Sequence, residues 1–121
     1  MRDELRSSGS EEKGSMDLRK VPRLRVHFRS FFAGGLIDGE GTVMDLSTKG
    51  CKIGSDTRVQ PVTELEVWFF LPDQDQPIRV QLAEVRWTRE REFGLEFLSM
   101  RLEERERLDR VLRDQGIGSR A

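Results

Sequence analysis

The chain has 121 residues, a formal net charge of -1 and equal shares of hydrophobic and charged residues, 36% each. This length fits one domain, since roughly 100 residues bury enough apolar surface to fold without metals or disulfides. The chain has one cysteine, which excludes an internal disulfide. With only one histidine in addition, it has too few ligands of the usual kinds for a structural zinc site. No stretch reaches the roughly 18 apolar residues of a membrane span, and the amino terminus lacks the apolar core of a signal peptide. The composition therefore predicts one cytoplasmic domain without membrane insertion.

The first segment, MRDELRSSGSEEKGSMDL, mixes charged and small residues with little periodicity, which is typical of a flexible arm. Met16 is a possible natural start, in which case the residues before it are an added leader. The next segment, residues 19–31, contains five basic residues and no acid, which favours a compact anion over an extended nucleic acid as partner. We therefore divide the chain into an arm or leader of residues 1–16, a folded domain of residues 17–115 and a flexible tail of residues 116–121.

Alternating apolar and polar residues predict six short strands. In the first strand, Leu24, Val26 and Phe28 share one face, and His27 lies on the opposite face with the arginines. Four glycines in the segment FFAGGLIDGEGTVMDL predict a strand end and a bent connection before the second strand. The later strands are expected near residues 40–46, 51–55, 62–71, 78–87 and 93–97.

The fifth strand changes phase after Leu82, and one extra residue near Ala83 and Glu84 predicts a β-bulge. Strands with turns at this spacing indicate a small antiparallel barrel or sandwich. Residues 99–115 then change to a helical period, with Ser99 as the expected N-cap. The predicted fold class is all-β with one helix, a six-stranded antiparallel β-barrel followed by a C-terminal α-helix.

Two arginines, Arg19 and Arg23, lie four residues apart just ahead of the first strand. A guanidinium group binds a phosphate bidentately or donates to the O6 and N7 acceptors of guanine. The same spacing recurs in Arg25 and Arg29, so this pair alone is also consistent with a solvated basic segment.

Asp45, Ser47 and Gly50 are crowded into the turn after the second strand. A carboxylate accepts hydrogen bonds from the N1 and N2 donors of guanine, and a serine hydroxyl donates to a phosphate or to the ring. Gly50 is expected to take a positive φ between two strands. The alternative is an ordinary turn in which Asp45 and Ser47 bond only local backbone amides.

In order and spacing, RxxxR followed by [DN]xSxxG resembles the signature of the PilZ domain. The resemblance extends to TVMDLSTKGCKI, LAEVRW and FGLEF and covers about residues 17–115. It implies a bacterial receptor for the second messenger cyclic di-GMP, folded as a six-stranded antiparallel β-barrel with a helix. By the family pattern, the arginines would clamp phosphate and the guanine Hoogsteen edge, and the turn would hold the other guanine edge. The implied ligand-binding residues are Arg19, Arg23, Asp45, Ser47 and Gly50.

Further candidates for the ligand site are Leu18, Lys20, Lys49, Trp87 and Gly94. Lys20 departs from an arginine often found beside the first motif arginine, which weakens one auxiliary contact. The residue before that arginine is thought to influence whether one or two ligands bind, and the apolar Leu18 favours one. Trp87, like Trp68, also fits a packing role, and Cys51 is expected to be buried and inert.

Catalysis finds little support, because one histidine, one cysteine and no visible acid cluster do not supply a metal site or a nucleophile with its base. The first hypothesis is a non-enzymatic receptor and adaptor whose arginine arm closes on cyclic di-GMP and signals to a partner protein. The alternative is a PilZ-fold protein-interaction adaptor that does not bind nucleotide. A third possibility is a single-stranded nucleic-acid binder, for which Phe31 and Phe32 beside Arg29 are the candidate stacking residues.

We expect no cofactor, no nucleic-acid polymer as partner, and a monomer or weak dimer. The downstream protein is not identifiable from the sequence, and motility, polysaccharide production and adhesion are all open by family analogy.

Overall fold

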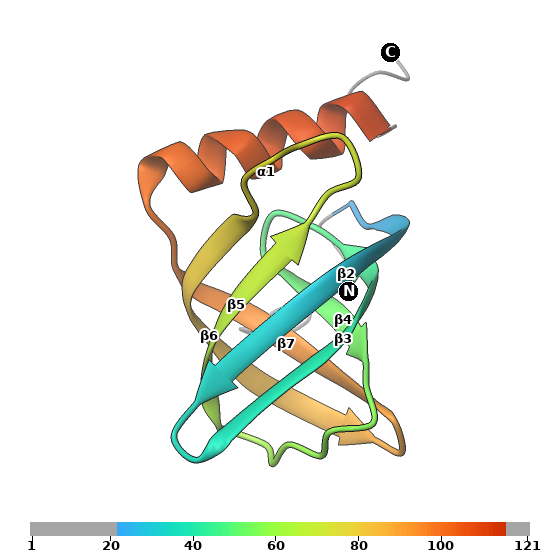
Figure 1. Cartoon of the computed structure of the whole chain (residues 1–121), viewed down its shortest axis with the longest axis vertical. Helices are drawn as coiled ribbons and strands as arrows, with labels where there is room; N and C mark the ends of the chain where they lie inside the picture. The colour runs from blue at the N-terminus through green and yellow to red at the C-terminus, as the bar shows by residue number, and fades with distance from the viewer. Residues whose placement is uncertain (1–21, 116–121) are drawn as a thin grey trace, which may run out of the picture.

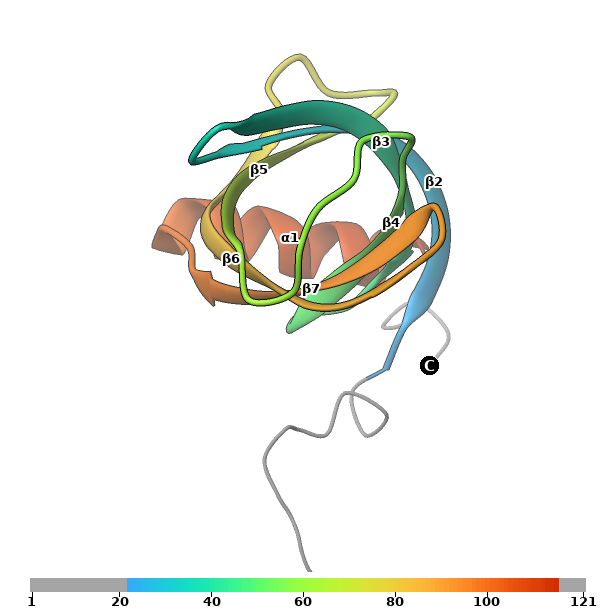
Figure 2. The ribbon, with the colours of Figure 1, turned by 90° about the horizontal axis from the view of Figure 1, so that it is seen from below.

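The structure, a computed structural model, describes residues 22–115. Its elements are β2 (Leu24–Gly34), β3 (Ile37–Leu46), β4 (Gly50–Gly54), β5 (Glu64–Phe70), β6 (Ile78–Arg89), β7 (Glu92–Ser99) and α1 (Leu102–Gln115). The six strands form a closed antiparallel barrel in the order β2-β3-β4-β7-β6-β5. Figure 1 shows the barrel from the side, and Figure 2 shows it from below, as a ring. The predicted fold class is confirmed.

Alternation along the strands separates a buried inner face from an outer face. In β2, Phe28, Ser30 and Phe32 are buried, whereas His27 and Arg29 at the alternate positions are exposed. The inward side chains of all strands form one apolar core, and its fully buried members include Phe32, Val43, Ile53, Val67, Phe69 and Val80. Each such side chain contributes about 1.5–3 kcal/mol of burial free energy, so the barrel interior is the main source of stability.

The first hairpin is longer and tighter than its glycine content suggested. β2 pairs with β3 without interruption from Phe28 to Gly34, and β3 already begins at Ile37. Gly35 and Leu36 connect the strands, and Gly35 takes a φ of 58°, which glycine adopts at no steric cost. The predicted strand end is confirmed at Gly34, but the predicted bent connection up to about residue 40 is wrong, because the other glycines of this segment lie within the strands.

β6 contains the expected change of phase, slightly earlier than predicted. The pairing with β5 is irregular between Val80 and Ala83, both of which point into the core, and Leu82 is left half-buried. The pairing with β7 is irregular again between Val85 and Trp87. These bulges help the strand to curve around the barrel, and the second one turns Trp87 to the outer face.

Helix α1 lies across one end of the barrel (Figure 1) and buries Leu108, Val111 and Leu112 against the core. Leu102, also part of the predicted stripe, is 70% exposed. The expected cap at Ser99 is wrong, since this residue still belongs to β7 and the helix begins three residues later. Within residues 22–115, no helix is long and apolar enough to cross a membrane.

Candidate functional site

The turn between β3 and β4 is organised by the hydroxyl of Ser47. Its Oγ accepts hydrogen bonds from the amides of Lys49 and Gly50, each at 3.1 Å, and donates to the Gly50 carbonyl at 3.3 Å. The Ser47 amide also donates to that carbonyl, at 2.9 Å. Ser47 is only 4% exposed, so water does not compete for these hydrogen bonds. The bonds of its hydroxyl therefore fix the shape of the turn. This matches the alternative in which Ser47 bonds local backbone groups.

Gly50 is required for a different reason from the one expected. Its φ is not positive, so the prediction of a left-handed conformation is wrong. A Cβ atom at this position would collide with the carbonyl oxygen of Leu95 in β7. The two strands are this close because Gly50 pairs with Glu96, and the Phe97 amide donates to the Lys49 carbonyl at 2.8 Å. Close approach of two backbones therefore selects glycine here.

Asp45 lies on the outer face of β3, between two cations from neighbouring segments. Its Oδ2 is 3.8 Å from Nη2 of Arg23 and 3.6 Å from Nζ of Lys52. The carboxylate is 21% exposed and the Arg23 side chain is 42% exposed. The structure thus brings an arginine of the first motif next to the acid of the second.

A row of paired outward residues runs across five strands from β2 to β6. Successive members pair as Arg25 with Asp45, Asp45 with Lys52, Lys52 with Gly94 and Gly94 with Trp87. We call these five residues the outer row. The residues that flank Lys52 and Gly94 along β4 and β7 are buried in the core, so the row itself belongs to the outer surface.

Trp87 covers Gly94 at one end of the outer row. A Cβ atom on Gly94 would fall on the indole ring, so only glycine lets the ring lie against β7. The guanidinium carbon of Arg89 is 5.9 Å from the Trp87 ring centroid, within the range of a cation–π contact. Toward one end of the outer row, the Trp87 ring lies beside the guanidinium group of Arg89. Toward the other end, the carboxylate of Asp45 lies between the cations Arg23 and Lys52.

Cys51 lies directly behind this surface and is buried, as expected. Burial, and secondarily the negative charge of Asp45, raise the pKa of its thiol well above the usual range. The thiol is therefore neutral and takes no part in acid–base chemistry near neutral pH.

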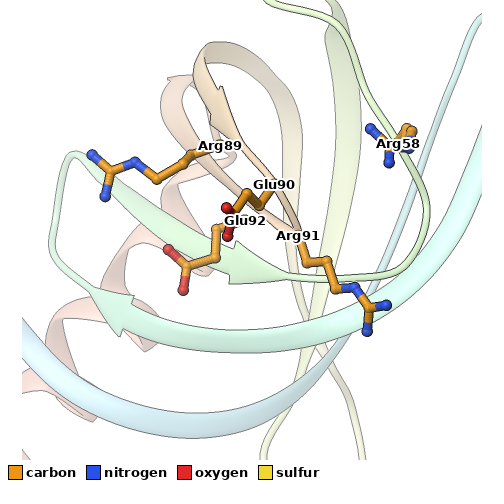
Figure 3. A pocket seen from close by; sticks show the side chains of 5 residues that line it. All are labelled: Arg58, Arg89, Glu90, Arg91 and Glu92. Carbon is orange, nitrogen blue, oxygen red and sulfur yellow. The ribbon is translucent and has the colours of Figure 1, made fainter.

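A hollow of about 790 Å³ lies at the opposite end of the barrel from α1, and none of its lining residues belongs to either motif. Three of its lining residues are arginines, Arg58, Arg89 and Arg91, and their guanidinium groups lie apart and do not converge on a common point (Figure 3). In the described part of the chain, no group of three or more histidine, cysteine or acidic residues is placed to hold a metal ion. The outer row remains the candidate site.

The aromatic residues proposed for nucleic-acid stacking separate in the structure. Phe32 is fully buried, which contradicts its candidate role as an exposed stacking residue. Phe31 instead packs on Trp68 with ring centroids 5.5 Å apart, and Arg29 lies 5.5 Å from the Phe70 ring centroid. These four residues form an aromatic patch on the outer face of β2 and β5, apart from the outer row.

Several predicted positions lie outside the described residues: Leu18, Arg19, Lys20, the arm of residues 1–16 and the tail of residues 116–121. Among the described candidates, Asp45, Gly94 and Trp87 share the outer row, and Ser47, Lys49 and Gly50 form the adjoining turn.

The sequence model of the PilZ domain matches residues 17–114, which is most of the chain. The chain belongs to the PilZ family. PilZ domains are generally receptors for cyclic di-GMP or adaptors for partner proteins, and they are not enzymes. Among curated proteins, none matches the chain.

Two solved structures share the PilZ fold with this chain at 15% sequence identity. The PilZ domain of CeSA from a cellulose synthesizing bacterium matches with a TM-score of 0.60, covering 74% of this chain and 93% of that domain. The Bacillus subtilis inhibitor of motility, MotI/DgrA, matches with a TM-score of 0.63, covering 83% of this chain and 52% of that protein. This chain therefore spans about half the length of the inhibitor.

Three cations of this surface, Arg25, Lys52 and Arg89, were not predicted as site residues. Lys52 could have been found, because it alternates with the buried Cys51 and Ile53 and faces Asp45 across a short hairpin. Arg89 could not, since its place beside Trp87 depends on a bulge that the alternation pattern does not locate.

Proposed function

We propose that this PilZ protein is a receptor for cyclic di-GMP, and that its binding surface consists of the outer row, Arg23 and the turn formed by Ser47 and Gly50. The observation that carries the proposal is the 3.8 Å approach of Arg23 to Asp45, because it joins the two sequence motifs on one surface. Membership of the PilZ family supports the choice of ligand.

The ion pair between Arg23 and Asp45 is suited to exchange. A partly exposed pair at this distance contributes about 0–1 kcal/mol, so a phosphate can take over the guanidinium group at little cost. Asp45 is then free to accept from the N1 and N2 donors of guanine. Lys52 adds positive charge beside the position proposed for the nucleotide.

Trp87 provides a surface on which a guanine ring can stack. Base–aromatic stacking contributes about 1–3 kcal/mol per base, and Arg89 over the indole adds a donor for a phosphate or a ring acceptor. Ser47 and Gly50 act by holding the turn in shape, so that Asp45 and Lys49 project beside the nucleotide.

Arg19 completes the site by the family pattern, with Lys20 as an auxiliary contact. We infer that binding draws the arginine arm onto the outer row, because the phosphates of the nucleotide offer its arginines stronger anionic partners than the single Asp45 carboxylate that Arg23 contacts without ligand. The changed surface would then signal to a partner protein. Leu18, without a charge, favours one nucleotide per domain.

Calorimetric titration with cyclic di-GMP tests this proposal. Wild type should bind, and Arg23→Ala should weaken binding by about 10- to 100-fold, since a hydrogen bond to a charged group is worth about 1.5–3 kcal/mol. Arg29→Ala is the matched control, because Arg29 is a similarly basic residue of the same segment that pairs with Glu40 away from the outer row. Absence of heat with wild type, or equal affinity in wild type and Arg23→Ala, would refute the proposal.

A second candidate function is an adaptor that binds a partner protein without nucleotide. The aromatic patch of Arg29, Phe31, Trp68 and Phe70 favours it, because aromatic residues and arginine are common in the centres of protein interfaces. Such an adaptor would give no heat with cyclic di-GMP, and Phe70→Ser would weaken its binding to the partner while Arg23→Ala would not.

A further inference from the structure

The turn of the candidate site is hydrogen-bonded to helix α1. Nη1 of Arg105 donates to the carbonyl oxygen of Thr48 at 2.6 Å, across 57 residues of sequence. The bond is short and charge-assisted, and both residues are partly buried, which limits competition from water. A residue outside both sequence motifs therefore reaches the centre of the second motif.

The peptide unit between Thr48 and Lys49 is held at both ends. Its carbonyl accepts from Arg105, and its N–H donates to Oγ of Ser47 at 3.1 Å. A peptide unit is planar, so bonds to both ends fix its orientation and with it the direction in which the exposed Lys49 side chain leaves the backbone. Ser47 alone leaves the carbonyl end of this unit free to tilt.

Arg105 acts from a helix that is anchored independently. Leu108 and its apolar neighbours on α1 are buried, and Oε1 of Glu104 accepts from the Arg79 amide at 3.0 Å. Arg107 donates to the carbonyls of Gln76 and Pro77 at 2.5 and 3.0 Å. Loss of the Arg105 side chain should therefore release the turn and leave the helix in place.

We propose that Arg105 is a positioning residue of the nucleotide site, which holds the turn in its binding form through the Thr48 carbonyl and couples α1 to ligand occupancy. This inference rests on the proposed receptor function. Coupling is reciprocal: if the contact strengthens nucleotide binding, then the bound nucleotide stabilises the contact and the first turns of α1 by the same factor.

Titration of cyclic di-GMP into wild type, Arg105→Ala and Arg107→Ala tests the affinity. Arg105→Ala should weaken binding by about 5- to 20-fold, in the range of ordinary coupling between sites. Arg107→Ala is the matched control, because it removes the same charge and the same kind of carbonyl contact from the same helix, but at the β5–β6 connection. Its affinity should stay within about twofold of wild type.

Hydrogen exchange provides the second measurement. In wild type, cyclic di-GMP should slow amide exchange at Lys49, at Gly50 and in the first turns of α1, and Arg105→Ala should lose the slowing in α1. Equal affinity of Arg105→Ala and wild type would overturn the inference and leave the receptor function standing. Equal weakening by Arg107→Ala would also overturn it, since general loosening of α1 would then explain the effect. Failure of wild type to bind would instead refute the receptor function on which the inference depends.

Discussion

At the scale of single residues, two members of one motif have different tasks. Asp45 faces outward between Arg23 and Lys52, where a ligand can reach it. Ser47 is buried, and its hydroxyl is occupied by the backbone of its own turn. The spacing of the motif predicts both residues as ligand contacts, because it does not show whether a side chain points into the barrel or out to solvent.

Ser47→Ala should lower the free energy of unfolding by about 1–3 kcal/mol, because it leaves the amides of Lys49 and Gly50 without their acceptor. Urea unfolding measures this loss. Ser55→Ala is the control: its hydroxyl makes a similar pair of backbone bonds, to Glu40 and Thr57, at a more exposed place where water can replace it. Equal losses in the two variants would contradict the structural role of Ser47.

Cys51 should make stability depend on pH above neutrality. Burial holds the pKa of its thiol above the unfolded-state value of about 8.5, so the unfolded chain loses this proton first as pH rises. The contribution to stability is complete below about pH 8.5 and is lost at higher pH, by about 1.4 kcal/mol per pH unit. Urea unfolding between pH 7 and pH 10 should therefore show the advantage of wild type over Cys51→Ala shrinking. Parallel pH profiles would contradict this account.

At the scale of elements, β7 is the strand against which the site is built. Gly50 of β4 lies against the backbone of β7, and the indole ring of Trp87 packs on Gly94 of β7. Both glycines are needed for space and neither for a positive φ. The alternation pattern predicted β7 itself, but not these approaches. The Gly50 approach depends on the register of the non-consecutive strands β4 and β7, and the Gly94 approach depends on the irregular pairing of β6 with β7.

The two glycines should respond differently to an added methyl group. Gly94→Ala collides with a side chain that can move, whereas Gly50→Ala collides with the Leu95 carbonyl, which is fixed in the barrel. Overpacking costs about 1–3 kcal/mol, and we expect Gly94→Ala at the lower end and Gly50→Ala at or above the upper end. Urea unfolding measures both losses, and the Trp87 emission should shift in Gly94→Ala. A larger loss in Gly94→Ala than in Gly50→Ala would argue against this packing.

At the scale of the whole molecule, the spacing of apolar residues along the sequence was sufficient to predict six strands and a helix. The reason is that the inward side chains of every element pack into one core. The meeting of Arg23 with Asp45 also follows from a hairpin that pairs the strand after one motif with the strand before the other. The contact between Arg105 and Thr48 was not predictable, because it depends on how α1 crosses the barrel end. The outward turn of Trp87 likewise depends on a bulge.

The central claim is that cyclic di-GMP binds on the outer row. The chain has two tryptophans, and Trp68 lies in the aromatic patch away from that row, so it serves as an internal control. The most direct measurement is a titration of the ¹⁵N-labelled protein with cyclic di-GMP, followed by NMR at the two indole N–H signals and the backbone amides. We predict that the Trp87 indole and the amides of Asp45, Lys52 and Gly94 shift while the Trp68 indole stays in place. A shift confined to Trp68, or no shift in either indole or in these amides, would contradict the account.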